Sequence, residues 1–264
     1  MPVLHAIVLG IVQGLTEFLP ISSSGHLSVV PWLLGWTELT GNPDLQRSFD
    51  VALHMGTFIG AVVYFRRDLW RLATRQRRLG LLLGLSAVPA AVAGVALESV
   101  VEGQLSAKWL IGVMLIVFGL VLAWADRLAG TRQEGSYGPR DALLMGAAQA
   151  AALQPGVSRS GATMSMGRRI GFDRDAAARL SFLMSLPIIA GAGLFQGAQV
   201  VADGGLPPGV VPAFVWGVVA SGVTGFAAVW LLLRLVRTRT FTPFVVYRVI
   251  AGVAIIALAA YRTV

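Results

Sequence analysis

The chain has 264 residues, of which 56% are hydrophobic and 13% are charged, and it contains no cysteine. Soluble proteins carry about a quarter charged residues, so this composition excludes a soluble two-domain protein. The lack of cysteine excludes disulfide-stapled domains and cysteine-based metal or thiol chemistry. A net charge of +8 would suit a nucleic-acid partner only if it formed a face or a stripe. The arginines instead form short clusters between long apolar runs, which predicts an all-α polytopic membrane protein with no nucleic-acid partner.

The first apolar stretch, residues 1–33, is interrupted near its centre by Pro20-Ile21-Ser22-Ser23-Ser24-Gly25. Each half is too short to cross about 30 Å of hydrocarbon, and proline and glycine end a helix. We therefore expect a re-entrant helical hairpin, which is tolerated where it is buried in protein or lines a wet cavity. The stretch has no basic n-region or cleavage site, so a signal peptide is not expected.

Three apolar segments of spanning length follow, at 49–65, 79–97 and 107–125. A second interrupted stretch, 142–167, is broken by Pro155-Gly156-Val157-Ser158-Arg159-Ser160-Gly161 and is predicted to form a second re-entrant hairpin. Three further spans are predicted at 180–202, 210–233 and 243–262. The predicted architecture is therefore six transmembrane helices plus two hairpins.

The basic residues agree with this layout. Loops 66–78, 126–141, 168–179 and 234–240 hold sixteen of the 21 Lys and Arg residues, whereas loops 34–48, 98–108 and 203–209 hold only Arg47 and Lys108. The positive-inside rule makes the basic loops cytoplasmic and predicts both termini outside. If both interrupted stretches crossed fully, basic loops would lie on both faces.

The two hairpins align when the sequence is shifted by 136 positions. Gln13 then falls on Gln149, Ser22 on Ser158, and Gly25 on Gly161. Because three spans follow each hairpin, the second copy is inverted relative to the first. The chain is interpreted as a single membrane domain, 1–264, made of repeat one (1–125) and repeat two (142–264), a plan that forms sites near the midplane. The alternative is chance recurrence of small residues that serve helix packing.

Glu17 and Arg159 are the only formal charges of residues 1–37 and 142–167. Ionisable groups at that depth are expensive and indicate function by default. Gln13 lies one turn before Glu17 and shares its helix face. A purely structural pairing of Glu17 with Arg159 is the alternative, but it would not require the serines and the histidine nearby.

Each break precedes a helix N-terminus, where free N–H groups favour an anion. Arginine binds phosphate bidentately and serine hydroxyls fill the remaining acceptors, so the two breaks predict a phosphate cradle. Ser23, His26 and Glu17 supply a nucleophile, a base and an orienting group. The predicted phosphate-binding residues are Ser22, Ser24, Ser158, Arg159, Ser160 and Gly161, and the predicted catalytic residues are Ser23, His26, Glu17 and Arg159.

Three other polar residues are assigned lesser roles. Asp50 and His54 are interpreted as an interfacial hydrogen-bonded pair, with a place in the cavity as the alternative. Arg248 is expected to snorkel from the last span to the interface.

Two segments carry a family resemblance, Gln13-Gly-Leu-Thr-Glu17-Phe-Leu-Pro-Ile-Ser-Ser-Ser-Gly-His26 and Pro155-Gly-Val-Ser-Arg-Ser-Gly-Ala-Thr163. They resemble the two signature boxes of the bacitracin-resistance type of undecaprenyl-diphosphate phosphatase. Phe49–Thr57, Ser181–Pro187 and Tyr247-Arg248 also look like this family. The resemblance implies an enzyme of the bacterial plasma membrane that removes the terminal phosphate of undecaprenyl diphosphate and so recycles the carrier for peptidoglycan synthesis.

The resemblance also implies functional positions at Gln13, Glu17, Ser23, His26, Ser158 and Arg159, and dependence on Mg²⁺ or Ca²⁺. Some members have glutamate in place of Gln13, which gives two carboxylates one turn apart; here the predicted metal ligands are the Glu17 carboxylate and the uncharged carbonyl oxygen of Gln13. The expected reaction is attack by Ser23, with His26 or Glu17 taking its proton, or attack by His26 itself. The rival function is a transporter or flippase for a phosphorylated lipid or anion, since inverted repeats with broken helices suit transport equally. Membrane lipids are expected partners, and a homodimer is left open.

Overall fold

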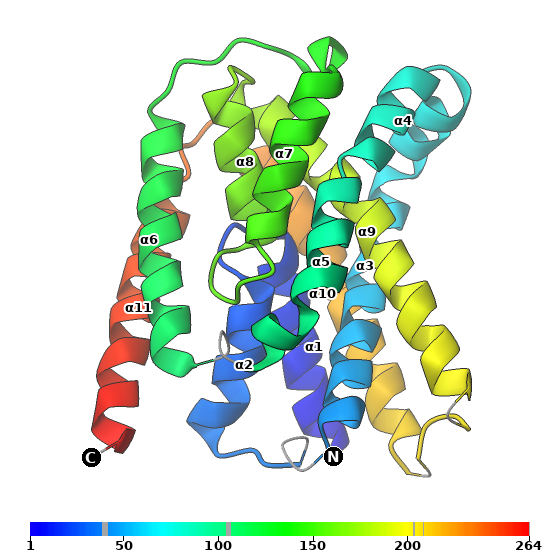
Figure 1. Cartoon of the computed structure of the whole chain (residues 1–264), viewed down its shortest axis with the longest axis vertical. Coiled ribbons are helices and arrows are strands. Elements are labelled where there is room, and N and C mark those ends of the chain that lie inside the picture. Colours follow the sequence, from blue (N-terminus) through cyan, green and yellow to red (C-terminus); the bar gives the residue numbers. More distant parts are fainter. Residues whose placement is uncertain (39–41, 104–106, 203, 208, 264) are drawn as a thin grey trace.

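The computed structural model describes residues 1–38, 42–103, 107–202, 204–207 and 209–263, and their regular structure is helical (Figure 1). The one isolated bridge in this part of the chain joins Arg132 to Phe172. The predicted all-α class is confirmed. The helices are α1 (Val3–Phe18), α2 (Ser23–Leu34), α3 (Pro43–Thr74), α4 (Arg77–Leu85), α5 (Val88–Gly103), α6 (Lys108–Asp126), the 3₁₀ turn η2 (Glu134–Ser136), α7 (Pro139–Ala151), α8 (Arg159–Arg169), α9 (Arg174–Ala202), α10 (Val211–Val236) and α11 (Thr242–Thr263).

Six apolar segments of the described chain are long enough to cross a membrane: Pro43–Thr74, Arg77–Ala96, Lys108–Asp126, Arg174–Ala202, Val211–Val236 and Thr242–Arg262. They coincide with the six predicted spans, which are confirmed. The segment predicted over 79–97 is not one continuous helix, because α4 ends at Leu85 and α5 begins at Val88. Pro89 explains the break, since its ring lacks an N–H and would clash with the Leu85 carbonyl in a continuous helix.

Both interrupted stretches form pairs of short helices that turn back on themselves. At the end of the first pair that lies away from its break, His5 of α1 stacks on Trp36 just after α2, with ring centroids 3.8 Å apart. At the corresponding end of the second pair, Arg132 bonds both Asp141 of α7, at 2.6 Å, and the Ile170 carbonyl after α8, at 2.9 Å. In Figure 1 the α1–α2 pair enters from the end that holds both termini, and the α7–α8 pair enters from the other end.

The four arginine-rich segments meet at one end of the bundle, opposite to the chain termini (Figure 1). Arg179 of α9 pairs with Asp68 of α3 at 2.8 Å and with Glu134 at 3.1 Å. Arg237 pairs with Asp175 at 3.1 Å. These contacts link segments 66–78, 126–141, 168–179 and 234–240, so the basic loops lie on one side, as the sequence predicts. Residues 39–41, 104–106, 203 and 208 of the three remaining loops lie outside the described residues.

Helix α10 packs closely against both α1 and α3 because glycine lines the contacts. A methyl group at Gly10 of α1 would lie 2.4 Å from the Gly217 carbonyl oxygen, and one at Gly60 of α3 would lie 2.3 Å from the Gly222 carbonyl oxygen. Small residues at such crossings let backbones approach each other, which is how apolar helices associate without a hydrophobic driving force. This packing holds α1, and with it Glu17, against the long helices.

The expectation that Arg248 snorkels to the interface is wrong. Its side chain is fully buried, and it donates hydrogen bonds to the carbonyls of Pro20, Gly156 and Leu115. The broken helices leave the Pro20 and Gly156 carbonyls without helical partners deep in the molecule. The guanidinium bonds these carbonyls instead of reaching the interface.

We predict that Gly60→Ala destabilises the protein by about 1–3 kcal/mol, because the added methyl group overpacks the α3–α10 contact. Thermal unfolding in detergent measures the effect. Gly197→Ala is the matched control, since a methyl group there meets nothing within 4 Å. A loss of stability in the control as large as in Gly60→Ala would contradict the packing argument.

Candidate active site

The two helix breaks have the same local backbone geometry. Ser22 and Ser158 are the N-caps of α2 and α8, with φ of 77° and 71° and ψ of 95° and 114°. Within the described residues they are the only non-glycine positions with positive φ. Each hydroxyl accepts a hydrogen bond from the N–H three residues on, Gly25 at 3.4 Å and Gly161 at 3.2 Å. The two serines that the 136-residue shift aligns therefore adopt the same strained N-cap.

The two breaks also touch each other. The Gly156 N–H donates to Ser22 Oγ at 3.0 Å, and Ser160 Oγ donates to the Leu19 carbonyl at 3.0 Å. A methyl group at Gly156 would lie 2.6 Å from the Ile111 carbonyl oxygen, and its φ of 95° favours glycine. The N-termini of α2 and α8 therefore converge at the centre of the molecule, where each has free N–H groups to offer an anion.

A pocket of about 140 Å³ opens beside these N-termini. Its wall is polar on the side of the two breaks and apolar on the side of α5 and α9. The lining residues are Glu17, Ser22, Ser23, Ser24, His54, Ala90, Gln149, Ala152, Leu153, Ser158, Arg159 and Ile188.

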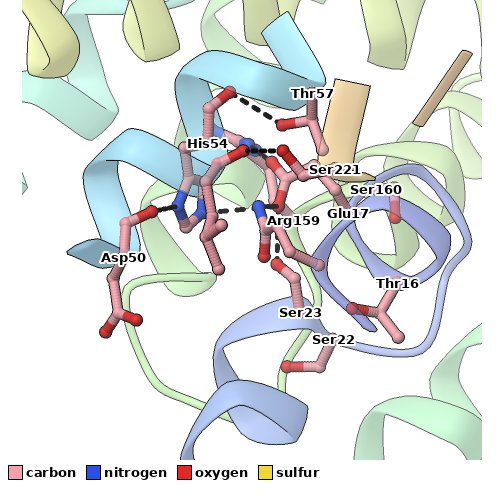
Figure 2. Close-up of polar contacts among 12 residues, drawn as sticks. Thr16, Glu17, Ser22, Ser23, Asp50, His54, Thr57, Arg159, Ser160 and Ser221 are labelled. Carbon is pink, nitrogen blue, oxygen red and sulfur yellow. Dashed lines mark hydrogen bonds and ion pairs between the residues drawn. The ribbon is translucent and has the colours of Figure 1, made fainter. Parts of the chain in front are cut away.

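The Glu17 carboxylate is the centre of the polar wall (Figure 2). Its side chain is 1% exposed. Arg159 forms an ion pair with Oε1, while Ser23 Oγ donates to Oε2 at 2.6 Å and Gln13 Nε2 donates to Oε2 at 3.0 Å. Side chains from both breaks thus meet at one carboxylate, which places a hydroxyl and its proton acceptor next to an arginine.

His54 is a site residue that the sequence interpretation ranked too low. Its Nε2 lies 3.4 Å from Glu17 Oε2, and it lines the pocket. The expected interfacial pair with Asp50 is wrong, because His54 Nδ1 bonds the Asp50 backbone carbonyl at 2.7 Å. The Asp50 carboxylate points away from the imidazole in Figure 2. The one-turn spacing of Asp50 and His54 was the available signal, but it did not show which side chain faces Glu17.

His26 lies away from the predicted nucleophile. Its Nδ1 is 2.6 Å from the Ser22 carbonyl, and its Nε2 is 2.6 Å from the Tyr247 hydroxyl. A carbonyl only accepts, so Nδ1 carries a proton and, in the neutral ring, Nε2 accepts from Tyr247. Both ring nitrogens are therefore engaged, and His26 is not among the residues that line the pocket.

The other predicted phosphate-binding residues lie around the breaks in different ways. Ser24 is exposed and lines the pocket. Ser158 Oγ lies 3.2 Å from Ser160 Oγ, and Ser160 is 4% exposed. Gly161 contributes its N–H to the Ser158 cap. The structure therefore brings Ser22, Ser23, Ser24, Ser158 and Arg159 to the pocket, with Ser160 and Gly161 behind its rim.

The family of the bacitracin resistance protein BacA matches residues 6–254. The chain belongs to this family. It is 44% identical to the undecaprenyl-diphosphatase of Nocardioides sp., a similarity that covers 97% of this chain and 96% of that protein. The chain is also similar to proteins of the same name from Pelobacter propionicus, at 46% identity over 98% of this chain and 97% of the relative, and from Geobacter sulfurreducens, at 46% over 97% and 98%.

A divalent cation in this BacA family chain would have few protein ligands. No group of three His, Cys, Asp or Glu side chains is placed to hold a metal ion in the part of the chain described. Gln13 Oε1, however, is buried without a hydrogen-bond partner and belongs to a side chain that already contacts Glu17. Mg²⁺ is commonly held by one or two protein oxygens together with phosphate oxygens. Gln13 and Glu17 therefore fit a cation that takes its remaining ligands from a bound phosphate.

We predict that Ser22→Gly is less destabilising than Ser22→Ala by about 1–2 kcal/mol. Both variants lose the cap and the bond from Gly156, but only glycine relieves the left-handed backbone. Unfolding in detergent measures both. Ser28, in the regular part of α2, is the matched control, where glycine is expected to be worse than alanine by up to about 1 kcal/mol. Equal losses for the two Ser22 variants would contradict the strained cap.

Proposed function

We propose that this protein hydrolyses undecaprenyl diphosphate to undecaprenyl phosphate and inorganic phosphate. The observation that carries the proposal is the 2.6 Å bond from Ser23 to Glu17, whose other oxygen pairs with Arg159, at the convergence of two helix N-termini. A hydroxyl with its base, an arginine and free N–H groups is the equipment of phosphoryl transfer. The names of the relatives and the family agree with this chemistry and with a lipid diphosphate substrate.

The terminal phosphate is placed at the N-termini of α2 and α8. Arg159 uses one amino group for Glu17, and its guanidinium has further donors that can bind phosphate oxygens. Ser22, Ser24 and Ser158 lie beside them on the pocket wall. The apolar side of the pocket, with Ala90, Leu153 and Ile188, faces the prenyl chain.

The reaction proceeds in two steps. Ser23 Oγ attacks the terminal phosphorus as its proton passes to Glu17, and the bond to the bridging oxygen breaks to release undecaprenyl phosphate. Water then attacks the phosphorus of the phosphoserine, the bond to Ser23 Oγ breaks as Glu17 returns its proton to that oxygen, and inorganic phosphate leaves with one proton of the water while the other passes to solvent. Arg159 and the helix N–H groups stabilise the charge that develops on the transferred phosphoryl group.

His26 is the alternative base or nucleophile. Either role would require His26 Nε2 to leave the Tyr247 hydroxyl and reach the phosphate. The direct bond between Ser23 and Glu17 supports serine as the nucleophile and leaves His26 to hold the first turn of α2.

We further propose that the two short helix pairs are re-entrant hairpins of an inverted repeat, 1–125 and 142–264, in a bacterial plasma membrane. The positive-inside rule then makes the arginine-rich end cytoplasmic and puts both termini outside. Because α1 and α2 enter from the end with the termini, the headgroup would be processed from the outer face.

A transporter or flippase is not favoured. Such proteins use broken helices in both repeats in a related way, whereas here Glu17 aligns with Leu153 and His26 aligns with Ala162. The nucleophile and base therefore occur in one repeat alone, which suits chemistry better than alternating access, and the relatives carry the name of a hydrolase.

We predict that purified wild-type protein releases phosphate from undecaprenyl diphosphate. Glu17→Gln should lower kcat by about 10²–10⁴-fold as the proton acceptor is lost, and Ser23→Ala should lower it at least as much. His26→Ala should lower kcat by no more than about tenfold, which corresponds to the loss of one hydrogen bond. Labelled phosphate should be trapped on wild-type protein and not on Ser23→Ala. Trapping that survives in Ser23→Ala and is lost in His26→Ala would make His26 the nucleophile.

Dependence on Mg²⁺ or Ca²⁺ is a separate proposal. A bound cation would neutralise phosphate charge, with Gln13 and Glu17 as its protein ligands. The Glu17 carboxylate would then be both a ligand of the cation and the acceptor of the Ser23 proton. The two reaction steps use only groups of the protein itself.

We predict that chelation lowers phosphate release and that Gln13→Glu lowers the Mg²⁺ concentration needed for half-maximal rate by about tenfold or more, since added ligand charge strengthens binding. Stabilisation of the substrate-bound protein against heat by Mg²⁺ gives a readout independent of turnover. Activity unchanged by chelator in wild type and in Gln13→Glu would exclude the cation.

A further inference from the structure

The Arg248 side chain lies at the centre of the molecule and has 0% exposure. Among the described residues, the guanidinium donates to five main-chain carbonyls. Nη1 bonds Pro20 at 3.0 Å, Nη2 bonds Gly156 at 2.8 Å, Val157 at 3.0 Å and Met114 at 3.4 Å, and Nε bonds Leu115 at 3.0 Å.

These carbonyls come from three separate parts of the fold. Pro20 lies in the first break, Gly156 and Val157 lie in the second, and the other two belong to α6. One side chain on α11 therefore joins both breaks to the long helices. The carbonyls in the two breaks lack helical partners, and each would be costly to bury alone.

Within the part of the chain described, the guanidinium bonds main-chain carbonyls and pairs with no carboxylate. A buried cation without a counter-ion costs several kcal/mol unless its donors are satisfied. Here each nitrogen of the guanidinium has a carbonyl partner but the charge has no counter-ion, and the proposed anion is the substrate phosphate at the N-terminus of α8. A methyl group at Gly161, in the first turn of α8, would lie 3.0 Å from Arg248 Nη1.

The bonded carbonyls also immediately precede the site. Pro20 stands two residues before Ser22, and Val157 stands directly before Ser158. These carbonyls point toward Arg248. Because the C=O and N–H of a peptide unit point in opposite directions, α2 and α8 begin with their N–H groups on the pocket side. Tyr247, the neighbouring residue on α11, bonds His26 in the first turn of α2.

We propose that Arg248 is a positioning residue for phosphoryl transfer: it fixes the two helix N-termini, and so Ser23 relative to Arg159, and it places an uncompensated positive charge behind the phosphate. This inference rests on the proposed function. Displacement of a reacting group by about 1 Å can cost roughly 10²-fold in rate, so the geometry of the breaks is where a small change has a large effect.

The test compares Arg248→Gln and Arg248→Lys with Arg262→Lys. Arg262 is the matched control, because it lies on the same helix and also donates to a carbonyl, that of Trp32 at 2.7 Å. Arg248→Gln should lower kcat by about 10²-fold, Arg248→Lys should keep the charge and lose less, and Arg262→Lys should keep wild-type kcat and KM. Guanidinium ion should restore activity to Arg248→Ala and should have no effect on Arg262→Ala.

Two further measurements separate positioning from folding. Gly119→Ala keeps the Arg248 guanidinium in the protein but adds a methyl group 3.2 Å from Arg248 Cβ, which should displace the side chain slightly, and a several-fold loss of kcat in folded protein is expected. Orthophosphate should protect the wild-type protein from thermal unfolding. Arg248→Gln should need about tenfold more orthophosphate for the same protection, whether or not undecaprenyl diphosphate is the substrate.

Wild-type kcat and wild-type orthophosphate protection in folded Arg248→Gln would overturn the inference. If the Gln variant does not fold, wild-type kcat in both Arg248→Lys and Gly119→Ala would do the same. Failure of the proposed function gives a different result, because wild-type protein would then release no phosphate while orthophosphate protection would still report on the cradle.

Discussion

A helix that stops inside an apolar layer leaves main-chain groups that water cannot reach, and this constraint governs the centre of the molecule. The two breaks meet it with groups from the chain itself. Ser22 and Ser158 cap the N–H groups of α2 and α8, and Arg248 takes carbonyls from both breaks and from α6. The two caps are local, but Arg248 lies far from both breaks in the sequence, so the carbonyls of the breaks find this partner only in the folded chain.

The same constraint produces the pocket. Two helix N-termini directed at one point leave a surplus of donors, and a surplus of donors favours an anion. Glu17 and Arg159 then occupy that point together, with the carboxylate 1% exposed. Glu17 bonds both Ser23 and Arg159, so the groups that stabilise the breaks are also those that the proposed phosphoryl transfer needs.

Symmetry in the breaks coexists with asymmetry in the chemistry. The caps at Ser22 and Ser158 have matching backbone angles, which are set by local steric and hydrogen-bonding rules. The residues around them differ, with Glu17 opposite Leu153 in the alignment. Glu17 and Ser23 come from α1 and α2, and Arg159 comes from α8, so the cluster at the carboxylate needs both helix pairs.

Residue patterns along the chain were sufficient to predict the six spans, the two interruptions, the common side of the arginine-rich loops and the meeting of Glu17 with Ser23 and Arg159. These follow from helix length, from proline and glycine, and from the cost of charge at depth. Three side-chain positions depend on the packing of the folded chain. His54 faces Glu17, His26 bonds the Tyr247 hydroxyl, and Arg248 bonds carbonyls more than 90 residues away in the chain. Those three outcomes depend on which neighbour's donor or acceptor lies within about 3 Å, and residue spacing along one helix does not contain that information.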